Sequence, residues 1–287
     1  MKRVLVAHSP DADDIFMYYA IKFGWVDTKD LIFENHALDI ETLNLEAIKN
    51  SYDVSAISFA LYPKIRNEYA LLKTAVSFGE GYGPKLVKLK DKKLKKNFKV
   101  ALSGANTTNA MLFKIAYPNA RIIYKNFLEI ESSILSGEVD AGVLIHESIL
   151  NYDSTLEVER EIWDIWLELS KGGLPLPLGG MALRRSIPLS RAIDIENILI
   201  QAVKVANENM EKLSQMLIEK ELVRVDAPTL KRYLNMYANE ESITMSPLQY
   251  EAIDTLFKVG YEAGFYDKII CAQDYLIPSE YATLRHS

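Results

Sequence analysis

The sequence predicts an α/β protein of two lobes with a cleft between them. Short β-branched runs alternate with helical patterns along the chain, which is typical of sheets whose strands are mainly parallel. With 287 residues, the chain is longer than an ordinary single domain. Hydrophobic residues make up 49% and charged residues 25% of it, so material for a core is ample.

The first lobe is predicted from three strands and two helices in alternation. Residues 2–8, 31–39 and 53–59 have the apolar, β-branched character of strands. Residues 15–24 and 40–50 have apolar residues at helical spacing. This order is that of consecutive βα units.

Three further strands, at 98–103, 121–126 and 141–147, are predicted to form the second lobe. A run of eight lysines at 85–99 precedes them, and we place the crossing between lobes near residue 90. The lysine run is interpreted as a solvated connector, with a patch that attracts phosphate or lipid as the alternative.

From residue 172 the pattern turns largely helical. Helices are predicted at 196–220 and 246–265, the second with Ser246 as its N-cap. These helices are expected to return and cover the first lobe. The predicted organisation is therefore a discontinuous larger α/β domain, residues 1–90 plus 185–287, with an inserted smaller α/β domain, residues 91–184.

Composition excludes several classes of function. A net charge of −6 disfavours a general nucleic-acid binder. Cys271 is the only cysteine, so an internal disulfide and a thiolate metal cluster are both excluded. No stretch approaches 18 consecutive apolar residues, and the apolar start of the chain is too short for a signal peptide. We therefore predict a cytoplasmic protein without membrane insertion.

Four loops follow predicted strands, where α/β sheets place their ligands. In SGANTTN (103–109), Thr107 and Thr108 precede an apolar helix and could bind a carboxylate together with free backbone N–H groups; an ordinary helix cap is the alternative. Ser58 interrupts an apolar run, where its hydroxyl needs a partner either in the core or on a ligand.

The loop SPDADD after the first strand places Asp11, Asp13 and Asp14 within four residues. Metal binding is one interpretation, but no matching ligands appear at recognisable spacing elsewhere. We favour carboxylates at a helix start and leave their role open. His146 follows the apolar run VLI, where a strand would end in the cleft. It is a candidate general base or a structural histidine.

At these loops the sequence resembles the 1,4-dihydroxy-6-naphthoate synthase family of the futalosine route to menaquinone. The matching segments are DIETLN (39–44), ISFALY (57–62), GYGP (81–84), ANTTN (105–109), GEVDAGVLIHES (137–148) and GLPLPLG (173–179). The chain departs from many members after Ser-Pro, where SPDADDIF replaces a Cys-Pro-Asn-Asp-Thr pattern.

The resemblance implies a two-lobed periplasmic-binding-protein-like (type II) fold and a lyase. The reaction would convert cyclic dehypoxanthine futalosine to 1,4-dihydroxy-6-naphthoate and dihydroxyacetone, without metal or organic cofactor. The implied catalytic residue is His146, acting as a general base. The implied substrate-binding residues are Ala56, Ile57, Ser58, Thr107, Thr108 and Asn109.

Two alternatives stay open. Chorismate dehydratase acts in the same pathway on a related fold, and a non-catalytic protein that closes on a small carboxylate would share the cleft. The predicted partners are a small-molecule carboxylate substrate and, if the protein is a homodimer, a second copy of the chain.

Overall fold

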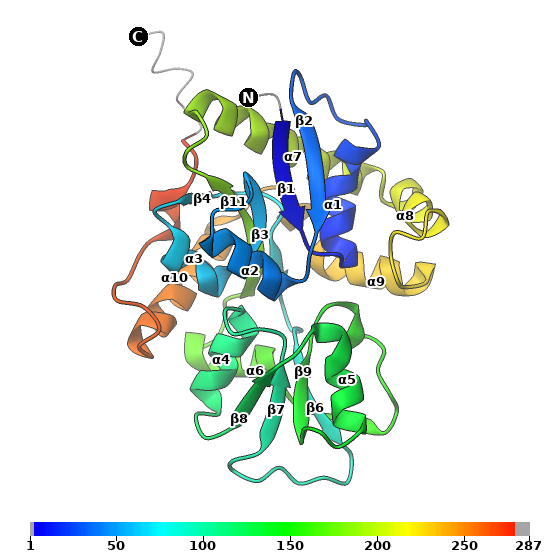
Figure 1. Ribbon diagram of the computed structural model, residues 1–287, viewed down its shortest axis with the longest axis vertical. Helices are drawn as coiled ribbons and strands as arrows, with labels where there is room; N and C mark the ends of the chain where they lie inside the picture. Colours follow the sequence, from blue (N-terminus) through cyan, green and yellow to red (C-terminus); the bar gives the residue numbers. More distant parts are fainter. Residues whose placement is uncertain (1–2, 279–287) are drawn as a thin grey trace.

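A computed structural model describes residues 3–278, so the two ends of the predicted larger domain, residues 1–2 and 279–287, lie outside the described part. Two sheets form two lobes, one above the other in Figure 1. The strands of the first sheet are β1 (Arg3–His8), β2 (Ile32–Ala37), β3 (Val54–Ser58), β4 (Tyr69–Leu71), β5 (Ser77–Gly79) and β11 (Leu176–Arg184). Those of the second are β6 (Lys85–Leu89), β7 (Lys99–Leu102), β8 (Arg121–Tyr124), β9 (Ala141–Leu144) and β10 (Leu156–Glu161).

Each sheet has a parallel part and an antiparallel part. In the first sheet, with order β2-β1-β3-β11-β4, β1 runs parallel to β2 and β3, whereas β11 runs antiparallel to β3, β4 and β5. In the second sheet, with order β10-β6-β9-β7-β8, β7 runs parallel to β8 and β9, and β6 runs antiparallel to β9 and β10. The parallel strands bring their carboxyl ends, and the loops that follow them, to one edge of each sheet.

The helices cover the two sheets. The first lobe carries α1 (Ala12–Lys22), α2 (Ile40–Ile48), α3 (Tyr62–Ile65), α7 (Leu189–Glu208), α8 (Met210–Glu219), α9 (Ala227–Tyr237) and α10 (Pro247–Glu262). The second carries α4 (Thr108–Ala116), α5 (Phe127–Leu135) and α6 (Ile162–Ser170). Helices α2, α4, α5, α9 and α10 begin at a residue whose side chain caps the helix. Ser246 caps α10 in a reciprocal capping box with Gln249, as predicted.

The late helices return to the first lobe, which confirms that prediction. Helix α7 packs on α1, and its Ile195 and Leu199 share a buried cluster with Val4 and Val6 of β1. The predicted helix at 196–220 is two helices, because the chain breaks at Asn209 between α7 and α8.

The sheets divide the chain differently from the predicted boundaries at residues 90 and 184. Strand β6, already from Lys85, pairs within the second sheet, and β11 is back in the first sheet from Leu176. The prediction that the chain turns largely helical from residue 172 is wrong at its start, because Leu176–Arg184 is strand β11. The proline and glycine residues of this segment are not typical of a strand. Packing explains two of the glycines: a Cβ at Gly179 would lie 2.9 Å from the Ile57 carbonyl oxygen, and one at Gly180 would lie 2.9 Å from the Phe59 ring.

Two lysines of the run at 85–99 form ion pairs with acidic side chains of the second lobe. Lys88 on β6 is buried and pairs with Glu157 and Glu159 of the neighbouring β10, and Lys92 lies 2.8 Å from Asp140. Residues 85–89 of the run are strand β6, which lies between β10 and β9 in the second sheet, so the prediction of a solvated connector is wrong for this part of the run.

Candidate active site in the cleft

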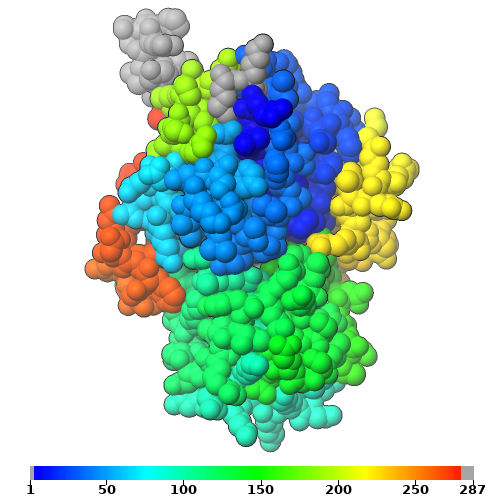
Figure 2. All heavy atoms as spheres, viewed as in Figure 1, coloured from blue at the N-terminus to red at the C-terminus, as the bar shows by residue number. Residues whose placement is uncertain are grey.

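A cavity lies between the lobes, and both contribute to its wall. It has about 730 Å³ of empty space, open mouth included. The space-filling view in Figure 2 shows the first lobe, in blue, resting directly on the green second lobe along the face drawn. Hydrogen bonds from the Ala12 N–H to Glu147 and from the Ala60 N–H to Thr108 join the two lobes across the cleft, so the lobes are closed around this cavity.

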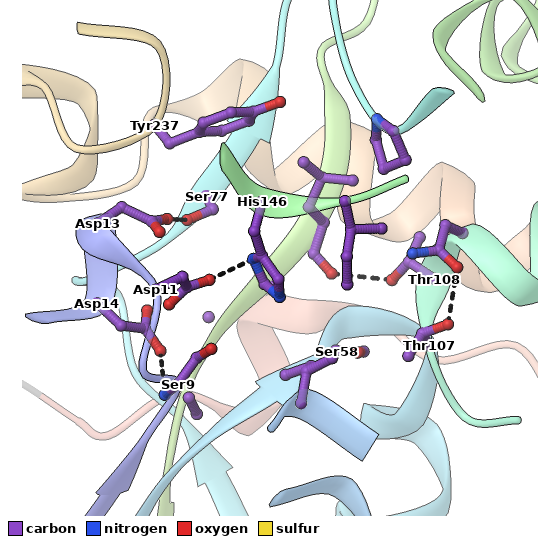
Figure 3. Close-up of a pocket in the computed structure, with 18 of the residues that line it drawn as sticks. Ser9, Asp11, Asp13, Asp14, Ser58, Ser77, Thr107, Thr108, His146 and Tyr237 are labelled. Atoms are coloured by element: carbon purple, nitrogen blue, oxygen red, sulfur yellow. Dashed lines mark hydrogen bonds and ion pairs between the residues drawn. The ribbon is translucent and has the colours of Figure 1, made fainter. Parts of the chain in front are cut away.

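One end of the cavity is acidic because β1 delivers the SPDADD loop to the start of α1. Asp11 is the N-cap of α1, and Asp13 and Asp14 lie in its first turn, where the helix dipole favours carboxylates. Asp14 accepts a hydrogen bond from the Ser9 N–H at 2.7 Å, and Asp13 accepts one from the Ser77 hydroxyl at 2.8 Å. Figure 3 shows these side chains converging from one side of the pocket.

His146 stands between this acidic end and the rest of the cavity. Its Nδ1 contacts the Asp11 carboxylate from the opposite lobe, whereas its Nε2 is buried and has no hydrogen-bond partner. The Phe127 ring packs against the imidazole in an edge arrangement, with centroids 4.8 Å apart. The imidazole is therefore fixed at one nitrogen and free at the other, as a base requires.

The backbone at His146 is unusual. The residue begins the short 3₁₀ helix η2 (His146–Ile149), which follows β9, and has a φ of +56°. This left-handed conformation costs a residue with a Cβ of order 1 kcal/mol, so the surrounding contacts must hold it. Such strain at a cleft residue is typical of a functional position.

Electrostatics in the acidic end couple several groups. Burial disfavours the charged imidazole, but the carboxylates around it, Asp11 foremost, raise the pKa of His146 to about 9. Burial likewise opposes ionisation of Asp11, and the imidazolium overcomes it, so that the pKa of Asp11 is lowered. Burial and the charge of Asp11 raise the pKa of Asp13 to about 7 and hold the pKa of Asp14 well above its ordinary value. At neutral pH the pair of His146 and Asp11 is therefore an imidazolium–carboxylate.

The other end of the cavity is the start of α4. Thr107 caps this helix, accepting from the Ala110 N–H at 3.3 Å and donating to the Asn109 side chain at 2.9 Å. Thr108 bridges the lobes, accepting from the Ala60 N–H at 3.2 Å and donating to the Leu178 carbonyl at 2.9 Å. Both hydroxyls are thus engaged within the protein. The Ala110 N–H is thus occupied, whereas the N–H groups of Thr108 and Asn109 have no acceptor within the helix and offer an anion site.

Ser58 ends β3 beneath the cavity and is paired with Asn44 of α2. The Asn44 amide donates to the Ser58 hydroxyl at 3.0 Å, and the Ser58 N–H donates to the Asn44 carbonyl oxygen at 2.9 Å. Since the hydroxyl accepts in this pair, its own hydrogen stays available for a ligand.

Every residue that the sequence predicted as part of the site lines this cavity. These are Ala56, Ile57, Ser58, Thr107, Thr108, Asn109, His146 and the three aspartates. Their roles stay predictions. The sequence did not predict Ser77 or the phenols Tyr233 and Tyr237, which also line the cavity. The spacing of the two tyrosines, four residues apart on α9, was the only available signal for them.

The three aspartates also match the geometry of a cation site, since one oxygen from each lies within 4.8 Å of the others. Each, however, has an oxygen engaged by His146, by Ser77 or by the Ser9 N–H. The raised pKa of Asp13 and of Asp14 indicates that protons can balance the cluster. The second oxygen of Asp11 and that of Asp13 are buried and have no hydrogen-bond partner among the described residues, so these two oxygens are available to a ligand.

Comparison with known proteins places the chain in a family. A family model described as "Menaquinone biosynthesis" matches residues 4–262. The chain belongs to this family. Two relatives, both named 1,4-dihydroxy-6-naphthoate synthase, come from Thermus thermophilus and Streptomyces coelicolor. The first is 31% identical over 68% of this chain and 71% of its own, and the second is 26% identical over 86% and 89%.

Solved structures identify the fold. An Archaeoglobus fulgidus protein of known crystal structure is 32% identical, covers 92% of this chain and 98% of its own, and superposes with a TM-score of 0.84. The periplasmic aliphatic sulphonate binding protein of Escherichia coli, only 12% identical, has a TM-score of 0.63 over 96% of this chain and 98% of its own. The fold is therefore periplasmic-binding-protein-like, as predicted. Within residues 3–278, no helix has the length and apolar character needed to cross a bilayer.

Proposed function

We propose that this protein is a 1,4-dihydroxy-6-naphthoate synthase. It would be a carbon–carbon lyase that converts cyclic dehypoxanthine futalosine to 1,4-dihydroxy-6-naphthoate and dihydroxyacetone without a metal or organic cofactor. One observation carries the proposal: the buried, unpartnered Nε2 of His146 lies in the same cavity as the N-terminus of α4. The names of the two relatives supply the product, 1,4-dihydroxy-6-naphthoate.

Charge orients the substrate in the cavity. Its carboxylate would be repelled by the acidic end and attracted to the first-turn N–H groups of α4, at Thr108 and Asn109. The hydroxyl-rich, sugar-derived part then faces the acidic end, where Asp13 can donate or accept hydrogen bonds. This orientation sets the bicyclic centre beside His146.

His146 would begin the reaction as a general base. The pKa of His146 is about 9, so the base is the neutral fraction of the imidazole, which grows as the pH rises toward 9. Asp11 holds the Nδ1–H, so the lone pair of this neutral form lies on Nε2. Nε2 takes an activated proton from the substrate, the bond to the sugar-derived fragment breaks, and aromatisation of the naphthalene ring drives the sequence. Base catalysis of this kind contributes about 10²–10⁴-fold. The closed lobes exclude water from the intermediate.

The test is incubation of the purified protein with cyclic dehypoxanthine futalosine, without added metal or cofactor, followed by chromatography. We expect naphthoate and dihydroxyacetone in equal amounts. Chorismate is incubated in parallel, and its dehydration would instead support the chorismate dehydratase alternative. Calorimetric binding of either compound without turnover would support a carboxylate-binding protein and contradict the proposal.

A further inference from the structure

Two consecutive residues of the second lobe reach across the cleft to the start of α1. His146 contacts the Asp11 side chain, and Glu147 accepts a hydrogen bond from the Ala12 N–H at 2.9 Å. Ala12 is the first residue of α1, so the carboxylate occupies the helix N-terminus, where the dipole favours an anion. Glu147 is buried in this position.

Glu147 is also connected to the imidazole through Arg224 and Phe127. Its second oxygen lies 3.8 Å from the Arg224 guanidinium, which belongs to the segment between α8 and α9. That guanidinium stands over the Phe127 ring, 5.2 Å from its centroid, and Phe127 in turn packs on His146. The His146 turn is thus held from both lobes.

The contact between Glu147 and the Ala12 N–H stabilises a turn with a strained backbone. The left-handed backbone of His146, with a φ of +56°, persists only where neighbouring contacts fix it. The neighbouring residue in the chain supplies such a contact, because Glu147 ties the turn to α1 of the opposite lobe. Without that tie the turn can relax and carry the imidazole away from Asp11.

We propose that Glu147 is a positioning residue, which docks the His146 turn onto the N-terminus of α1 so that the His146–Asp11 pair is assembled only when the lobes close. The proposal rests on the proposed role of His146. Glu147 itself is not among the residues that line the cavity, so it acts through its neighbour.

The chain offers a matched control at another contact between the lobes. Glu41 of α2 accepts from the Asn106 N–H at 3.1 Å and from the Asn106 side-chain amide at 2.9 Å. This carboxylate also joins the lobes, but it contacts the threonine loop rather than the histidine turn. Loss of Glu41 therefore loosens closure while leaving the contact between Glu147 and Ala12 in place.

The experiment compares Glu147→Ala, Glu147→Gln and Glu41→Ala in steady-state turnover. Gln keeps an oxygen for the Ala12 N–H, so we expect its kcat within about fivefold of wild type. Ala removes that acceptor, and a misplacement of about 1 Å at the base lowers kcat about 100-fold with little change in KM. Glu41→Ala should mainly raise KM. Glu147→Asp, which keeps the charge but is one methylene too short, should behave like Ala and serves if Ala does not fold.

An NMR titration gives a second readout that does not depend on turnover. The chain has four histidines, and His146→Asn assigns the signal of interest. The groups facing this imidazole are Asp11, Asp13 and Asp14 at α1, Tyr233 on α9, Glu147 itself and, beyond it, Arg224. Loss of Asp11 contact in Glu147→Ala should lower the pKa of His146 further than Glu147→Gln does. Equal titration and equal kcat in the Ala and Gln variants would overturn the proposal. A wild type that titrates as expected but does not turn over the substrate would instead contradict only the proposed function.

Discussion

Replacing Asp11 with asparagine tests the electrostatic design of the site. Asparagine keeps the size of the side chain and an oxygen for the Nδ1–H, but removes the charge that holds the imidazolium. The pKa of His146 is about 9 against an ordinary 6.5, a difference worth about 3 kcal/mol at 1.36 kcal/mol per unit. Burial opposes the imidazolium in any case, so Asp11→Asn should lower the pKa of His146 by at least about 2 units.

The assay is the dependence of kcat/KM on pH between 6 and 10. If neutral His146 is the base, the wild-type rate rises with pH through a midpoint near 9, the pKa of the imidazole. In Asp11→Asn that midpoint should move to about 7 or below. A midpoint that stays where the wild type has it would refute the assignment of the titrating base to His146 and its pairing with Asp11.

The same pair predicts how stability depends on pH. A histidine whose pKa is raised on folding contributes stability that is fully present below 6.5 and is lost as the pH rises through about 9. The free energy of unfolding of the wild type should therefore fall by up to about 3 kcal/mol across this window. Urea denaturation at three pH values measures it, and Asp11→Asn should show a much smaller fall.

Two further substitutions probe the two ends of the cavity. The pKa of Asp13 is raised from 3.8 to about 7, so the buried carboxylate lowers the free energy of unfolding as the pH rises from about 4 to 7. Asp13→Asn should therefore raise the free energy of unfolding at pH 8 by about 1–4 kcal/mol, measured by urea denaturation. An unchanged free energy of unfolding would contradict the raised pKa. Thr108→Val leaves the buried Ala60 N–H and the Leu178 carbonyl without their partner, so stability should fall by about 1–3 kcal/mol and KM should rise, whereas Thr108→Ser should keep both near wild type.

Local pattern was enough to predict the places where strands meet the cleft. His146 and the threonine loop follow β9 and β7 as expected, because apolar β-branched runs and a hydroxyl cap are signals that lie within a few residues. Strand β11 was not predicted from the sequence. Its glycines are required by the Ile57 backbone and the Phe59 ring, and neither contact is visible in the local sequence.

The chemistry of the site depends on contacts between distant residues. Asp11 and His146 are separated by 135 positions, and only closure of two lobes brings them together. The raised pKa of His146 follows from that contact, so a histidine considered alone suggests an ordinary base near pH 6.5. The left-handed backbone at His146 has no local signal either, because histidine is not a residue that marks positive φ as glycine does.

The most direct test of the account is a single-turnover experiment with wild type and His146→Asn, each in excess over cyclic dehypoxanthine futalosine. Asparagine tolerates a positive φ, so this variant should keep the turn and still bind the substrate. We predict naphthoate from the wild type and bound, unconverted substrate in the variant, with a rate lower by at least about 100-fold. Conversion by His146→Asn at the wild-type rate would contradict the assignment of the base.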